Sequence, residues 1–97
     1  MIKHIVLFRV TEGTPQDRIE DAIQRLEALV GVIPGLRSLD AGIDIGVAGN
    51  MSFGLVAELD DRESLDAFST DPRHMEVALS ILELRSEADI AVLDLEV

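Results

Sequence analysis

Residues 2–10 read IKHIVLFRV, a run rich in Ile, Val, Leu and Phe that ends before the breaker sequence EGTP at residues 12–15. This composition predicts a β-strand. Side chains alternate along a strand, so the two faces can be assigned directly. One face carries Ile2, His4, Val6, Phe8 and Val10, and the other carries Lys3, Ile5, Leu7 and Arg9. Both faces therefore hold side chains of the buried type at their centres.

An amphipathic helix is predicted to follow this strand. Thr14 suits the N-cap, Pro15 suits the first helical position, and Asp17 places an anion in the first turn. The apolar side chains then follow the spacing of a single helical stripe. They are Ile19, Ala22, Ile23, Leu26, Leu29, Val30 and Ile33. The helix is expected to end at residues 31–35, where two glycines and a proline interrupt the pattern.

The next part of the chain predicts a hairpin and a short helix. Residues 39–45 alternate apolar and polar side chains, and residues 53–59 supply a second strand after a turn that contains glycine and asparagine. Asp60, with Glu63 three residues later, is typical of the start of a helix. This helix is expected to end near Thr70.

A last helix is predicted to begin at Asp71 and Pro72, which combine a cap residue with a proline at the first position. Its stripe is expected to consist of Met75, Ala78, Leu79 and Leu82, widened by Val77, Ile81 and Leu84. Residues 90–97 are predicted to form the final strand. The order β-α-β-β-α-α-β predicts a ferredoxin-like α+β sandwich, with an antiparallel four-stranded sheet that carries its helices on one face. The length of 97 residues suits a single domain over residues 1–97.

The sheet face opposite the helices is predicted to be apolar as well. The first strand offers Ile5 and Leu7 there. The last strand offers one of two sets, either Ile90 with Val92, or Ala91 with Leu93 and Leu95. An exposed apolar patch across two strands is unusual for a monomer, and the sheet of a second copy would cover it. We therefore expect a homodimer; in the alternative, Lys3, Arg9 and acidic residues screen a mildly apolar open face.

Composition excludes several classes of function. Nineteen acidic residues against eight basic ones give a formal net charge of −11. This charge repels nucleic-acid phosphate and anionic lipid, so neither nucleic acid nor a membrane is an expected partner. No run reaches the roughly 18 apolar residues of a membrane-spanning helix and no export signal is visible, so we expect a cytoplasmic location. The chain has no cysteine, which excludes disulfides, thiolate zinc sites and a nucleophilic thiol.

The two histidines, His4 and His74, do not show the spacing of a metal site. Asp71 or Asp94 could join them, but the spacing matches neither a His-x-x-x-His nor a Glu-x-x-His pair on one helix. The glycines match no phosphate-binding loop. We therefore expect no metal and no cofactor.

Four segments carry a family resemblance. They are KHIVLF at residues 3–8, IPGL at residues 33–36, DPRH at residues 71–74 and VLD at residues 92–94. In this order and spacing they resemble the stress-responsive A/B barrel family, also called the dimeric α+β barrel domain, over nearly the whole chain. The resemblance implies a ferredoxin-like protomer and a homodimer whose two sheets close into an α+β barrel.

The resemblance also implies a pocket between the sheet and the helices. A plant member of the family is similar to a polyketide cyclase, whose pocket holds two histidines at positions that match His4 and His74, helped by a tyrosine. Two positions depart from that pattern: Asp71 replaces a histidine of the family segment, and Phe68 stands at the tyrosine position. Because phenylalanine cannot donate a phenolic proton, the resemblance extends to the pocket more than to the cyclase chemistry.

The helical position of His74 predicts a neutral imidazole. It is about the third residue of the helix begun by Pro72, where the positive end of the helix dipole and burial both lower the pKa of the ring. A neutral imidazole can act as a general base or accept a hydrogen bond. In the plainer alternative, His74 only takes part in capping and His4 closes one end of the core.

Two functions follow from these patterns. The first is a homodimeric α+β barrel protein that binds a small organic molecule in an apolar pocket, with cofactor-free proton transfer on a carbonyl compound as the chemistry it could perform. His74 would be the base and His4 the polarising partner, and the pocket would be completed by Val6, Phe8, Leu26, Phe68 and Ala78. The second is a non-catalytic dimer with a stress-related structural or assembly role. A very small pocket, with both histidines far apart and bound to the backbone, would favour the second.

Overall fold

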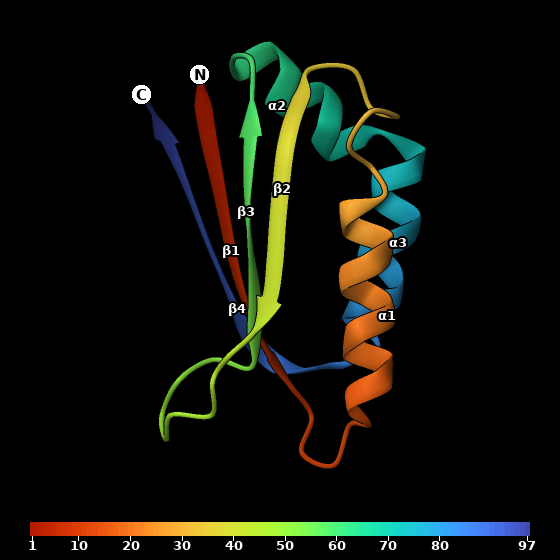
Figure 1. Cartoon of the computed structure of the whole chain (residues 1–97), viewed down its shortest axis with the longest axis vertical. Helices are drawn as coiled ribbons and strands as arrows, with labels where there is room; N and C mark the ends of the chain where they lie inside the picture. Colours follow the sequence, from red (N-terminus) through yellow and green to blue (C-terminus); the bar gives the residue numbers. More distant parts are fainter.

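A computed structural model describes the backbone of residues 1–97 and the side chains of residues 1–85 and 89–97. Seven elements follow one another along the chain (Figure 1). They are β1 (Ile2–Val10), α1 (Gln16–Glu27), β2 (Leu36–Ile43), β3 (Phe53–Leu59), α2 (Arg62–Thr70), α3 (Pro72–Leu82) and β4 (Arg85–Glu96). This order confirms the predicted ferredoxin-like α+β fold. None of the described helices is long and apolar enough to cross a membrane.

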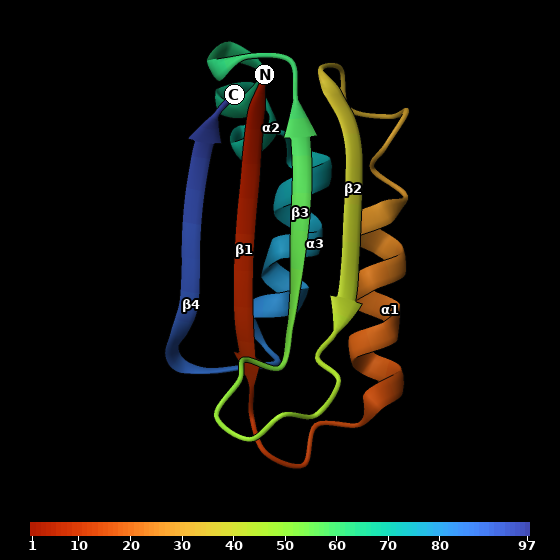
Figure 2. The same ribbon diagram turned by 60° about the vertical axis from the view of Figure 1, so that its left-hand side comes forward.

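The strands form one antiparallel sheet in the order β2-β3-β1-β4, which Figure 2 shows with the helices behind it. β1 lies inside the sheet, with β3 on one side and β4 on the other. All three helices lie on one side of the sheet, and the outer face is uncovered (Figure 1). The register pairs Ile5 of β1 with Leu93 of β4. Because paired residues share a face, the outer face of β4 carries Ala91, Leu93 and Leu95, and the inner face carries Ile90 and Val92.

The core lies between the helices and the inner face of the sheet. Its largest fully buried side chains are Phe68, Leu26 and Leu59. Phe8 and Phe53 stack with their ring centroids 4.7 Å apart. Among the residues whose burial is described, none in the core is polar or charged. Apolar burial is therefore the main stabilising contribution that these side chains make.

The ends of α1 differ from the prediction. Pro15 occupies the N-cap position, and the hydroxyl of Thr14 donates to a backbone carbonyl of the preceding turn instead of capping the helix. The helix ends at Glu27, yet Leu29 and Ile33 are buried. The predicted stripe therefore runs past the helix into turns that fold back onto the same core.

Four other boundaries are shifted. β2 begins at Leu36, three residues before the predicted start. The N-cap of α2 is Asp61, not Asp60, and its carboxylate accepts a hydrogen bond of 2.8 Å from the backbone N–H of Ser64. Ile45, predicted to lie in a strand, is 93% exposed beyond the end of β2. β4 begins at Arg85, five residues before the predicted start, because pairing with β1 extends the strand into a segment of mixed polarity.

α3 begins where it is predicted to, with Asp71 as its N-cap, but its buried face is rotated. Val77 and Ile81 are buried, whereas Met75 and Leu79 are 49% and 60% exposed. α3 carries apolar residues around most of its circumference, so spacing alone does not determine which stripe is buried. Packing against α1 and the sheet selects it.

Candidate functional site

A cavity of about 250 Å³ lies between the inner face of the sheet and the helices. Side chains of β1, β3, β4 and all three helices line it, and most are apolar. The lining includes all seven residues that the sequence places in a pocket: His4, Val6, Phe8, Leu26, Phe68, His74 and Ala78. The fold therefore brings these residues together, and ligand binding by them stays a prediction.

His4 is anchored by a carboxylate at the edge of this cavity. It lies opposite Asp94 in the register of β1 with β4, and the Asp94 carboxylate is 2.5 Å from Nδ1 of His4. The side chain of His4 is 13% exposed and that of Asp94 is 39% exposed. A carboxylate that accepts from Nδ1–H sets the tautomer and the orientation of the ring. Nε2 is then the nitrogen that remains for a ligand.

His74 lies in the first turn of α3, as predicted, and its ring is half-buried. Its Nδ1 is buried and has no hydrogen bond of normal geometry to any described residue. Burial lowers the pKa of His74; the Ser69 backbone partly opposes this shift, His4 adds to it, and Asp71 opposes it. The direction agrees with the prediction, with burial as the leading cause. The imidazole of His74 is therefore neutral near pH 7.

Phe68 lies between the two histidines. Its ring centroid is 6.0 Å from that of His4, edge-on at 68°, and 4.2 Å from that of His74, tilted at 37°. Such aromatic contacts fix the relative orientation of the rings. Phe68 is 1% exposed, so it forms a rigid apolar wall between two polar rings. It supplies no proton of its own.

The carboxylate of Asp71 binds groups at the start of α3 and does not line the cavity. Its carboxylate caps α3 and accepts two hydrogen bonds, of 2.9 and 2.7 Å, from the guanidinium of Arg73. These hydrogen bonds lower the pKa of Asp71 to about 2. Arg73 also donates to the carbonyl of Val32 at 3.0 Å, so the arginine is fixed in turn. Among the side chains that are described, no three potential metal ligands converge.

Sequence reasoning misses part of the cavity. The remaining lining residues are Leu55, Ser69, Ile81, Leu82, Arg85, Ile90 and Val92. It also considers Asp94 only as a metal ligand, whereas the structure pairs Asp94 with His4. The missing information is the register of β4 against β1: shifting it by one residue would turn Asp94 away from His4.

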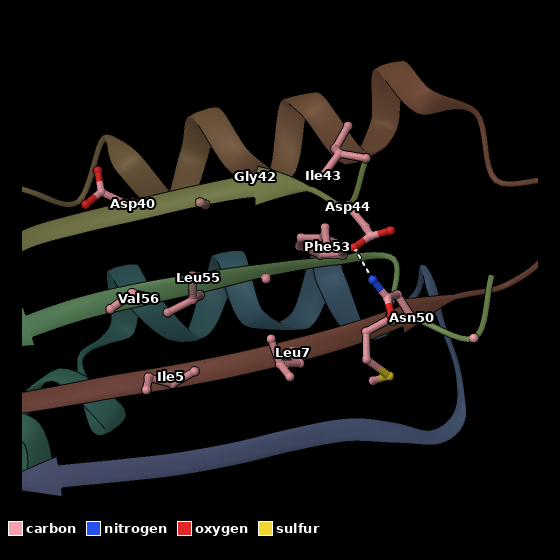
Figure 3. A pocket seen from close by; sticks show the side chains of 14 residues that line it. Ile5, Leu7, Asp40, Gly42, Ile43, Asp44, Asn50, Phe53, Leu55 and Val56 are labelled. Carbon is pink, nitrogen blue, oxygen red and sulfur yellow. Dashed lines mark hydrogen bonds between the residues drawn. The ribbon is translucent and has the colours of Figure 1, made fainter. Parts of the chain in front are cut away.

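A second hollow, of about 720 Å³, lies on the outer face of the sheet (Figure 3). Ile5, Leu7 and Val56 line its floor. Asp44 at its rim accepts hydrogen bonds from the Asn50 side chain at 2.9 Å, drawn as a dashed line, and from two backbone N–H groups of the same loop. These bonds lower the pKa of Asp44, the contact with Asn50 most of all. The Asp44 carboxylate therefore serves to hold the loop.

The fold and the inner cavity together define the class of protein: a ferredoxin-like α+β protein with two histidines in an apolar cavity between its sheet and its helices. Its sequence agrees with one family throughout. The chain belongs to the stress-responsive A/B barrel domain family, which matches residues 2–97.

Solved structures agree with this assignment. A dimeric ferredoxin-like protein of unknown function from Thermobifida fusca is 32% identical, with a TM-score of 0.87 over 99% of this chain and 90% of that chain. A dimeric ferredoxin-like protein from Jannaschia is 25% identical, with a TM-score of 0.86 over 99% and 98%. A hydroxynitrile lyase from Passiflora edulis is 20% identical, with a TM-score of 0.84 over 99% and 92%, and shares the fold. No curated protein matches the chain significantly.

Proposed function

We propose that this protein binds a small, largely apolar carbonyl compound in its inner cavity and transfers a proton on it without a cofactor. The observation that carries the proposal is the convergence of two differently held imidazoles on one apolar cavity. His4 is anchored by Asp94, while Nδ1 of His74 is buried with no hydrogen bond of normal geometry to a described residue, and burial lowers the pKa of this ring. One ring can accept a proton while the other stabilises developing charge.

In the proposed reaction, His74 removes a proton from the carbon next to the carbonyl group. The electrons of the broken C–H bond form the C=C bond of an enolate, and negative charge develops on the oxygen. This oxygen lies beside His4, the polarising partner, whose ring is held in place by the Asp94 carboxylate. The proton on His74 then returns to the substrate, so the cycle needs no co-reactant. Apolar walls such as Phe68 exclude water and strengthen these interactions.

Two observations favour this function over a purely structural dimer. A structural role for the histidines would suit two rings that are far apart and bound to the backbone. The Ser69 backbone does contact the His74 ring, but His4 binds a side chain, and both histidine rings contact Phe68 in the same cavity. The cavity of about 250 Å³ is also close to the lower end of ligand pockets, which span about 300–1,000 Å³. The fold of the Passiflora edulis hydroxynitrile lyase adds that this architecture can hold an enzyme active site.

We also propose that the protein is a homodimer in which two outer sheet faces pack together and close an α+β barrel. The outer face exposes Leu7, Val56, Leu93 and Leu95, each at least 40% accessible in one chain. Burying such a patch is favourable by about 25 cal/mol per Å² of apolar surface. The Thermobifida fusca and Jannaschia proteins are described as dimeric, which supports this arrangement.

The proton-transfer proposal is tested with 2,4-octanedione, a small apolar β-dicarbonyl compound, in deuterated buffer. The protein should accelerate deuterium exchange at the carbon between the carbonyl groups, as followed by NMR. His74→Ala should reduce the accelerated rate by at least about a hundredfold, within the range of general-base catalysis.

Met75→Ala is the matched control, because Met75 neighbours His74 but is half exposed on α3. It should retain the wild-type exchange rate. Binding of the dione without any acceleration of exchange would show a binding protein and not a catalyst. Absence of binding would contradict the proposal as a whole.

A further inference from the structure

The inner cavity is long, and its histidines stand at one end. Along β1 it is lined from His4 to Phe8, a separation of four residue steps that spans about 14 Å at the rise of a strand. Along α3 it is lined from His74 to Leu82, a separation of eight residue steps that spans about 12 Å at the rise of a helix. The two lengths agree because α3 runs beside the sheet (Figure 1). A ligand that fills this space is elongated.

Arg85 stands at the other end. It is the first residue of β4, pairs with Val10 beyond the end of the apolar segment of β1, and lines the cavity beside Leu82 and Ile90. Its residue is half-buried. Five other arginines are held in ion pairs: Arg9, Arg25, Arg37, Arg62 and Arg73. Among the side chains that the structure describes, no carboxylate forms an ion pair with Arg85. With respect to these side chains, the guanidinium of Arg85 is therefore available to a ligand.

We infer that Arg85 is an anion-binding end of the cavity and that the ligand class is an elongated apolar molecule with a terminal carboxylate. The guanidinium offers paired donors that match a carboxylate, and such charge-assisted bonds are stronger than neutral ones. The apolar walls between Arg85 and the histidines receive the hydrocarbon part. The other end of the ligand then reaches His4 and His74. This inference rests on the proposed function only in taking the inner cavity as the ligand site.

The acidic character of the whole chain makes a local cation necessary for binding a carboxylate. A net charge of −11 repels anions in general, so a preference for a carboxylate must come from a local cation. Arg85 is the only Lys or Arg side chain among the described residues that line this cavity.

The test compares octanoate with 1-octanol, two probes with the same chain length and different head groups. Binding is measured by calorimetry near neutral pH. The wild-type protein should bind octanoate at least about tenfold more tightly than 1-octanol, and Arg85→Gln should remove this preference by weakening octanoate alone. Unchanged affinity of Arg85→Gln for 1-octanol shows that the variant keeps its fold and cavity.

Arg18→Gln is the matched control, because Arg18 is exposed on α1 and does not line this cavity; it should leave both affinities unchanged. Equal affinity of wild type and Arg85→Gln for octanoate would overturn the inference while leaving the cavity as a ligand site. If neither probe binds but 2,4-octanedione does, the inference fails and the proposed function survives. If none of the three binds, both fail.

Discussion

His4 and His74 reach the same cavity but differ in how their nitrogens are satisfied. Nδ1 of His4 meets the Asp94 carboxylate, whereas Nδ1 of His74 is buried near the Ser69 backbone without a hydrogen bond of normal geometry to a described residue. An unsatisfied buried polar atom costs about 1–3 kcal/mol of stability. An apolar side chain at position 74 would avoid this cost, so the presence of a histidine fits a chemical role better than a structural one.

The first prediction concerns the pH dependence of stability. Burial lowers the pKa of His74 below 6.5, so the unfolded chain binds this proton more readily than the folded chain does. The free energy of unfolding of the wild type should therefore fall as the pH drops below 6.5, relative to that of His74→Leu. Above 6.5 the difference between the two proteins should be constant. Urea unfolding across this pH range measures it, and subtracting the variant removes the contribution of the carboxylates.

The same variant separates the two roles of His74. With a chemical role, His74→Leu should be as stable as the wild type at neutral pH, or more stable by about 1 kcal/mol, because it removes the unsatisfied nitrogen. A loss of stability at neutral pH would instead assign His74 to structure. An NMR titration that places the pKa of His74 above about 7 would contradict the burial argument.

The second prediction concerns Asp94, which we regard as a positioning residue. The Asp94 carboxylate accepts from Nδ1 of His4 and so favours the tautomer protonated at that nitrogen. Asp94→Ala should lower the population of this tautomer, as measured from ¹⁵N chemical shifts of the ring at high pH. Asp89→Ala is the control, because Asp89 lies on the same strand but pairs with Arg9. An unchanged tautomer in Asp94→Ala would show that the carboxylate does not orient the ring.

The candidate site could be predicted to the extent that it depends on alternation within one element. Val6 and Phe8 share a face with His4 because strand side chains alternate, and His74 follows from the cap at Asp71. Arg85 could not be assigned in this way. It lies outside the predicted limits of the last strand, and only the register of β4 against β1 brings it to the cavity.

At the scale of the element, the packing of the α1–β2 loop against α2 depends on Gly35. Gly35 has a φ of 83°, and a Cβ at this position would lie 2.5 Å from Oγ and 2.7 Å from Cβ of Ser64. The Gly35 carbonyl also accepts a hydrogen bond of 3.0 Å from the N–H of Asp60. Position 35 thus requires both the left-handed backbone and the missing side chain.

The third prediction uses Gly31 as a matched control. Gly31 has a similar φ of 85°, but a Cβ there would meet nothing within 4 Å. Gly31→Ala should lower the free energy of unfolding by about 1–2 kcal/mol, the cost of a left-handed alanine. Gly35→Ala should lower it by roughly 1–3 kcal/mol more, because of the steric conflict with Ser64. Equal losses in chemical denaturation would mean that Ser64 moves aside freely.

Whether a segment forms a helix or a strand was more predictable than which of its faces is buried. The alternation of β1 and the cap-plus-proline start of α3 identify these elements correctly because both signals are local. The buried face of α3 is a different matter: Met75 and Leu79 fit an apolar stripe as well as Val77 and Ile81 do. The choice between these stripes depends on what α1 and the sheet offer, and that information is not local.

At the scale of the whole molecule, the two faces of the sheet differ in what covers them. The inner face, with His4 and its neighbours, packs under the helices and forms the candidate site. The outer face leaves Leu7, at the hollow of Figure 3, and Leu93, on β4, accessible. Since the same strand β1 supplies both faces, covering the outer face would also stabilise the strand that carries His4.

The last prediction tests this coverage. Leu7 is 42% exposed in a single chain and lies on the outer face, so Leu7→Lys should leave each chain folded while placing two buried, unpaired charges in a symmetric dimer. Association should weaken by at least about a hundredfold, equivalent to about 3 kcal/mol. Leu79→Lys is the control, since Leu79 is more exposed and lies on α3, on the opposite side of the sheet; it should leave the dimer unchanged. Sedimentation velocity at micromolar concentration, with circular dichroism to monitor folding, separates dissociation from unfolding, and a monomeric wild-type protein in that experiment would refute the proposed barrel.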